Sequence, residues 1–157
     1  MIIKSAQSLV ETVIAAGLIA IGIVAAMALS TRSESQTSYA KQLAEANRYA
    51  VQAQDYFRTA RSYHGWNAIA TKITADALAN TTTYCLTSLS GDPTDFFTLT
   101  PANCTSSDIV PNTRFTRQVT IDSTRYDEGV LSLVITVSWP DKVTRTTNLE
   151  MELTSWQ

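Results

Sequence analysis

The strongest pattern in the chain is an apolar run near its N-terminus. Residues 13–29 include no charged or strongly polar side chain. Extended back to Leu9, and interrupted there only by Glu11 and one threonine, the run is just long enough to cross a bilayer as an α-helix. A secretory signal peptide is the alternative, because Lys4 precedes the run and small residues follow it. Glu11 argues against that alternative, since it lies where a signal peptide becomes purely apolar.

After Ser30 the polarity returns, but a helical period continues. Neither Gly nor Pro occurs between Ile23 and His64, so one continuous helix is predicted from Gln7 to about Arg61. Its apolar residues recur at alternating spacings of four and three, which places them in one narrow stripe. Such a stripe fits either a coiled-coil seam or a β-sheet, and its many alanines favour close packing on a sheet. The stripe consists of Tyr39, Leu43, Ala46, Ala50, Ala53, Phe57 and Ala60.

The rest of the chain changes period. A shorter second helix, capped by Asn67, is expected first. Short runs rich in β-branched and aromatic residues follow, separated by turn residues. In one of them every second residue from Leu131 to Trp139 is apolar, which predicts a buried face. The runs predict strands at residues 82–88, 115–121, 130–139 and 143–153.

Two turn sequences connect the later strands. Asp127-Glu128-Gly129 precedes the third strand, and Pro140-Asp141-Lys142 follows it. Consecutive strands with short turns form an antiparallel meander. The predicted fold class is therefore α+β, with a long N-terminal helix packed on a C-terminal antiparallel β-sheet.

Both cysteines, Cys85 and Cys104, lie far from the apolar run, in a stretch rich in Ser, Thr, Asn and Pro. A disulfide between them closes a loop of roughly 20 residues and stabilises the fold by about 3 kcal/mol on the chain-entropy model. It implies an oxidising compartment. The alternative is two unrelated thiols. A zinc site is not expected, because it needs about four ligands and His64 is the only histidine.

The sequence gives little support for an enzyme or a nucleic-acid-binding protein. It has no second imidazole, no Gly-rich phosphate loop and no nucleophile elbow, so we expect no catalytic residue. His64 is expected to be a solvent-exposed residue at a helix end, and the adjacent acids Asp127 and Glu128 to belong to a solvated turn. A formal charge of −2 with scattered Lys and Arg gives no basic field for nucleic acid.

The segment MIIKSAQSLVETVIAAGLIAIG carries the most specific signal. A short leader containing Lys4 ends in the small residue Ala6, and Gln7-Ser8-Leu9-Val10-Glu11 leads into the apolar run. This arrangement resembles the prepilin signal of the type IV pilin and pseudopilin family. In that family a membrane peptidase cuts after a small residue, usually Gly, and the fifth residue of the mature chain is Glu. A cut between Ala6 and Gln7 makes Glu11 the fifth residue.

The resemblance implies a division of the chain and a set of partners. Residues 1–6 are expected to be a leader peptide, residues 7–30 a transmembrane and filament-core helix, and residues 31–157 an outer domain. The implied partners are homologous pilin subunits in a helical filament, a prepilin peptidase and the cytoplasmic membrane. The outer domain is expected outside the cytoplasm and then on the surface filament. No cofactor is expected.

The cost of burying a carboxylate gives Glu11 an expected role that the cut before Gln7 would make possible. A carboxylate carried into a bilayer costs at least about 2 to 3 kcal/mol, so it normally has a partner. Cleavage creates a free amine on Gln7, one helical turn before Glu11. In a filament the amine of one subunit neutralises Glu11 of its neighbour, which fixes the register between subunits. The simpler alternative is that Glu11 lies among lipid headgroups, where its charge favours the helix dipole.

The predicted function is a structural subunit of a type IV pilus-like filament. The sequence does not separate a major pilin, a minor pilin and a pseudopilin, nor adhesion from secretion. The alternative is a single-span membrane protein whose outer domain binds a ligand and which does not assemble.

Overall fold

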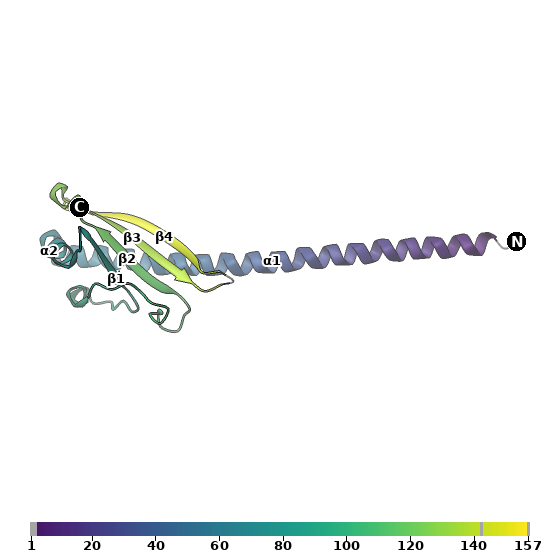
Figure 1. Cartoon of the computed structure of the whole chain (residues 1–157), viewed down its shortest axis with the longest axis horizontal. Helices are drawn as coiled ribbons and strands as arrows, with labels where there is room; N and C mark the ends of the chain where they lie inside the picture. The colour runs from purple at the N-terminus through teal and green to yellow at the C-terminus, as the bar shows by residue number, and fades with distance from the viewer. Residues whose placement is uncertain (1–2, 142, 157) are drawn as a thin grey trace. The chain divides into compact units, whose positions relative to one another are not determined.

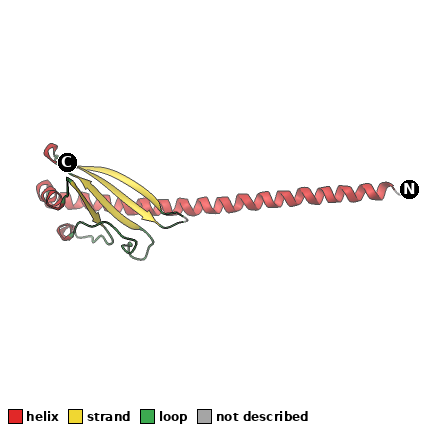
Figure 2. Ribbon diagram, viewed as in Figure 1, coloured by secondary structure: helices red, strands yellow, loops and turns green. Residues whose placement is uncertain are grey.

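The structure is a computed structural model that describes residues 3–141 and 143–156, with side chains from Leu9 onward. It confirms the α+β class (Figures 1 and 2). Two short 3-10 helices are labelled η. In chain order the elements are α1 (Ile3–His64), α2 (Trp66–Asp76), β1 (Thr81–Cys85), η1 (Pro93–Thr98), β2 (Thr116–Asp122), η2 (Tyr126–Glu128), β3 (Val130–Trp139) and β4 (Arg145–Thr154).

The chain divides into two compact units, and α1 contributes to both. The first unit ends at Gln42 and, in its described residues, is entirely helical. The second unit begins at Leu43 and contains the remainder of α1 and every other element. The predicted absence of a helix break before His64 is thus confirmed.

The four strands form one antiparallel sheet in the order β1-β2-β3-β4, so the predicted meander is confirmed. The register places Arg117 of β2 opposite Val137 of β3, and Ile135 of β3 opposite Leu149 of β4. On β3 every second residue from Leu131 to Trp139 is buried, as the alternation predicts. This face is one side of the core.

The other side of the core is the second half of α1, which packs on the sheet (Figure 2). The predicted apolar stripe is buried from Ala46 onward, and because alanine has the smallest apolar side chain, the helix lies close to the strands. Tyr49 packs its ring on Phe115 at a centroid distance of 5.3 Å. Sheet packing, and not a coiled-coil seam, is therefore correct for this part of the helix. Tyr39 lies in the first unit and is exposed.

Glycines define two of the boundaries. α1 extends to His64, beyond the predicted end near Arg61, because the break comes only at Gly65, whose φ of 80° suits glycine. Gly65 is also the N-cap of α2, so the predicted cap at Asn67 is wrong: Asn67 lies in the first turn. Gly129 has a φ of 72°, and a Cβ there would lie 2.4 Å from the Ser155 hydroxyl. The predicted turn before β3 is thus present.

The connection between β1 and β2 is longer than those between the later strands. The predicted turn Pro140-Asp141-Lys142 includes Lys142, which lies outside the described residues. Residues 86–115 include η1 and the predicted disulfide, which joins Cys85 to Cys104 with their Cα atoms 4.9 Å apart. The Cys104 amide donates to the side-chain oxygen of Gln118 on β2 at 3.0 Å. The connection is therefore fixed to the sheet midway along its length.

Arg117 is the largest polar side chain in the core. It lies on the inward face of β2, between the positions of Phe115 and Val119, and is only 2 % exposed. Its Nε donates to the Leu86 carbonyl at 3.2 Å, and its Nη1 donates to the Tyr49 carbonyl at 3.2 Å. Burial lowers the pKa of Arg117 to about 10, so the guanidinium remains charged at neutral pH. It links α1, β2 and the long connection.

We expect reduction of the disulfide to lower the free energy of unfolding by about 3 kcal/mol, because the unfolded chain regains loop freedom. Thermal unfolding of the full chain in detergent, followed by tryptophan fluorescence, should show a melting temperature lower by on the order of 10 °C in reductant. A chain carrying both Cys85→Ser and Cys104→Ser is the control and should not respond to reductant. An unchanged melting temperature for the native chain would contradict the prediction.

We expect Arg117→Leu to destabilise the second unit by about 2–4 kcal/mol, because the carbonyls of Tyr49 and Leu86 lose a charged donor. The matched control is Arg125→Leu. Arg125 pairs with Glu128 and Glu152 at the surface, where solvent screening leaves an ion pair with little effect on stability. Denaturant unfolding of both variants measures the difference. If Arg117→Leu is as stable as the native chain, the desolvation of the guanidinium outweighs its hydrogen bonds.

Candidate functional site

The first unit presents an apolar segment that nothing in the described chain covers. From Leu9 to Leu29 its large apolar side chains are all more than half exposed, for example Leu18 at 66 % and Ile21 at 68 %. By length and composition α1 is the one helix among the described residues able to cross a membrane. Each large aliphatic side chain contributes about 1.5–3 kcal/mol on full burial, so covering the segment is worth on the order of 20 kcal/mol.

Hydroxyl groups within and beside this segment are satisfied by the helix itself. Thr12 donates to the Leu9 carbonyl at 2.9 Å, and Thr31 donates to the carbonyls of Met27 and Ala28. A hydroxyl bonded to its own helix carries little penalty on leaving water. The segment is therefore suited to an apolar environment even at its few hydroxyl positions.

The predicted processing and assembly residues lie at the start of this segment. Ala6 and Gln7 belong to α1, but their side chains are outside those the structure describes. Glu11 is exposed, and no ion pair joins it to another side chain of the described part. Helical spacing places residues 7 and 11 one above the other. The helix thus brings the predicted new N-terminus and the carboxylate together on one face.

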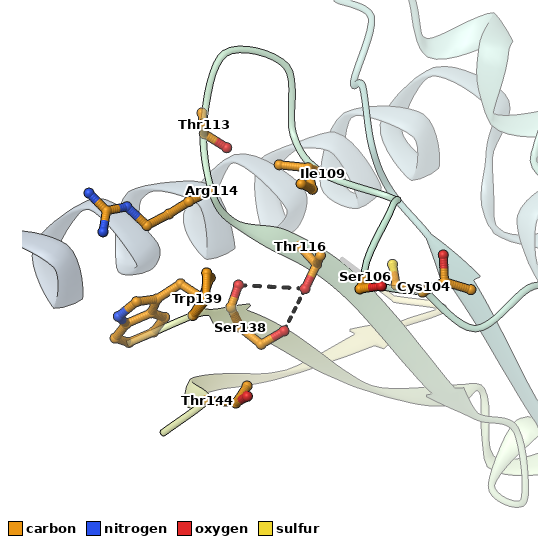
Figure 3. A pocket seen from close by; sticks show the side chains of 11 residues that line it. Cys104, Ser106, Ile109, Thr113, Arg114, Thr116, Ser138, Trp139 and Thr144 are labelled. Atoms are coloured by element: carbon orange, nitrogen blue, oxygen red, sulfur yellow. Dashed lines mark hydrogen bonds between the residues drawn. The ribbon is translucent and has the colours of Figure 1, made fainter. Parts of the chain in front are cut away.

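The second unit contains an open pocket of about 380 Å³ beside the disulfide (Figure 3). One wall is the loop between Cys104 and Arg114, and the floor is the start of β2 with the end of β3. The lining residues are Cys104, Thr105, Ser106, Ile109, Thr113, Arg114, Thr116, Ser138, Trp139, Pro140 and Thr144. No local sequence pattern predicts this pocket, because its residues meet only through the strand register.

A buried polar cluster elsewhere has a structural explanation. The Tyr84 hydroxyl donates to Asp76 at 2.8 Å, and Lys72 donates to the same carboxylate oxygen and to the Leu99 carbonyl. Burial, with the hydrogen bond to Asp76, raises the pKa of Tyr84 above its usual 10.0. One oxygen of this half-buried carboxylate accepts from two donors, so the cluster joins α2 to β1.

His64 is not the solvent-exposed residue that the sequence suggests. It is half-buried, with Nε2 2.9 Å from the Pro93 carbonyl and its ring edge-on to those of Tyr63 and Phe97. The reason is that η1 folds back on the end of α1. Among the described residues no group of three His, Cys, Asp or Glu is placed to hold a metal ion.

Of the predicted site residues, then, the fold unites Cys85 with Cys104 and leaves Glu11 in a separate unit. Two surfaces are considered further, the exposed apolar helix and the pocket near Arg114. Neither holds the acid–base or nucleophile pairs of a catalytic centre in the residues described. Comparison of the chain with protein-family models, with curated proteins and with solved structures gives no match.

Proposed function

We propose that this protein is a membrane-inserted subunit of a type IV pilus-like filament. The observation that carries the proposal is the division of α1 into an exposed apolar part and a part packed on an antiparallel sheet. The prepilin-like segment around Ala6 and Gln7 supports it. One continuous helix then connects a folded outer domain to a segment that lipid or neighbouring helices must cover.

In this proposal the helix acts in two environments in turn. It first spans the membrane, with the disulfide-containing unit on the oxidising side. After cleavage before Gln7, the helices of neighbouring subunits replace lipid around it. The new amine of one subunit then pairs with Glu11 of the next and fixes the axial position. Small residues such as Gly17 and Ala20 allow close helix approach.

A single-span binding protein is the second candidate, and the pocket beside Arg114 favours it. Both candidates require the membrane span and an exported domain. They differ in whether the N-terminus is cleaved before Gln7 and in whether copies of the chain assemble into a helical filament. Those two properties are therefore the ones to measure.

We expect the mature protein to begin at Gln7. Mass spectrometry of the chain purified from membranes, in cells that contain a prepilin peptidase, should show the loss of residues 1–6. The control is the same chain from cells without the peptidase, which should retain the leader. A start at Met1 in both cells, or a cut after Ala28 or Ser30, would contradict the filament proposal.

We expect Glu11→Ala to be processed and inserted normally but to enter filaments at least about tenfold less, since a buried amine would lack its partner. Glu34→Ala is the matched control, because Glu34 is also an exposed acid on α1 but lies beyond the apolar segment. The measurement is the ratio of sheared surface filament to membrane-bound subunit. Normal incorporation of Glu11→Ala would exclude the proposed pairing.

A further inference from the structure

The pocket beside Arg114 lies in the second unit and includes no residue of the apolar segment of α1. Its volume of about 380 Å³ lies within the range of small-molecule pockets. Its lining comes from segments far apart in the sequence, the loop at 104–114 on one side and residues 138–140 with Thr144 on the other, and Figure 3 shows them facing each other.

Hydroxyl groups on the wall and floor of the pocket are partly engaged within the protein. On the wall, Thr113 donates to the Val110 carbonyl at 2.7 Å and accepts from the Phe115 amide at 3.1 Å, which leaves one lone pair on its oxygen. On the floor, the hydroxyls of Thr116 and Ser138 are in contact, and Thr116 also reaches the Ser138 carbonyl at 3.5 Å. Either hydroxyl can be the donor of the shared hydrogen bond, and both oxygens keep lone pairs that can accept from a ligand that donates hydrogen bonds.

Backbone donors on the loop are also in use. The Cys104 amide donates to Gln118, the Thr105 amide to Asp108 at 2.7 Å, and the Ser107 amide to the Thr105 hydroxyl. The Asp108 carboxylate also accepts from the Thr105 hydroxyl, so this acid is satisfied within its own turn. The loop consequently offers no cluster of free amides of the kind that holds a phosphate.

Arg114 supplies the remaining donors. Its guanidinium has five N–H groups, and no ion pair or hydrogen bond engages it within the described part of the chain. It is the one charged residue in the described lining. A single unpaired guanidinium favours a carboxylate, which it binds through two parallel hydrogen bonds.

The apolar part of the lining limits the ligand further. Trp139 is only 1 % exposed, so its ring is not free to stack on a planar base or aromatic ligand. Ile109 and the exposed Pro140 provide aliphatic surface suited to the C–H face of a saturated ring. We propose that the pocket binds a carboxylated sugar, with the carboxylate on Arg114 and ring hydroxyls donating to Thr113, Thr116 and Ser138.

The disulfide contributes to this site. Cys104 is the first residue of the wall and is bonded to Cys85 at the end of β1, while the far end of the wall continues into β2. The Val110 amide donates to the Phe115 carbonyl at 2.8 Å and closes the loop. Covalent attachment at Cys104 thus holds the backbone of this wall in place before any ligand arrives, which lowers the entropic cost of binding.

The test is a titration of the full chain with D-galacturonate, in a detergent whose headgroup is not a sugar. Isothermal calorimetry gives the affinity, and the ¹⁵N signals of the arginine side chains show which guanidinium responds. We expect saturable binding with a shift of the Arg114 signal. D-galactose lacks the carboxylate and acetate lacks the hydroxyls, so each should bind at least about tenfold more weakly than galacturonate.

Variants assign the contacts. Arg114→Gln should weaken galacturonate binding by roughly tenfold or more. Thr116→Val should lower the affinity for galacturonate and for galactose by the same factor. Arg125→Gln is the matched control, because Arg125 is exposed on the second unit but outside the pocket lining, and its affinity should equal that of the native chain. Near-ultraviolet circular dichroism verifies that each variant is folded.

Three results would overturn the proposal. They are the absence of saturable galacturonate binding, equal affinity for galacturonate and galactose, and native affinity in Arg114→Gln. A different result also rejects the sugar: galacturonate does not bind, yet Arg114→Gln lowers filament incorporation. In that case the pocket receives an acidic side chain of a second copy of this chain. The titration does not require filament assembly. Failure to bind galacturonate would therefore leave the proposed function unaffected.

Discussion

The structure depends on one constraint, the continuity of α1 across two different surroundings. No residue between Ile23 and His64 interrupts the helix, yet the burial of its apolar side chains differs between its two parts. From Ala46 onward the stripe is buried against the sheet, whereas from Leu9 to Leu29 the side chains are exposed. Burial of the second part fixes the outer fold, whereas no described residue of the chain covers the first part.

A second constraint is the long connection between β1 and β2, which must be attached to the sheet and to α1. A stretch of this length would carry many unpaired backbone groups unless it were attached. The disulfide attaches it at Cys104, Arg117 attaches it at Leu86, and the Val110 amide pairs with the Phe115 carbonyl. A buried cation with neutral acceptors is tolerated here because it joins three segments at once.

The sequence predicts those features that repeat with a local period. The helical stripe and the alternation in β3 both follow from spacing alone, and both are confirmed. Arg117 is a charged residue at a position of β2 that the alternation makes inward-facing. That exception indicates a special role, but the sequence does not predict which groups accept its hydrogen bonds. Asparagine is a common N-cap, so the sequence favours Asn67 as the cap of α2. The positive φ of Gly65, which only the structure shows, places the cap there instead. The pocket depends on register between distant segments, which no local pattern encodes.

In the proposed filament, burial alone does not explain why the helix would leave the membrane. Lipid chains and neighbouring apolar helices cover residues such as Leu18 and Ile21 about equally well. A carboxylate is different, because hydrocarbon offers it no partner and an amine on an adjacent subunit does. Glu11 would therefore supply the preference for the filament that the rest of the segment lacks. The nearby hydroxyl of Thr12 donates to the Leu9 carbonyl and is neutral, so it is a weaker acceptor for that amine than the carboxylate.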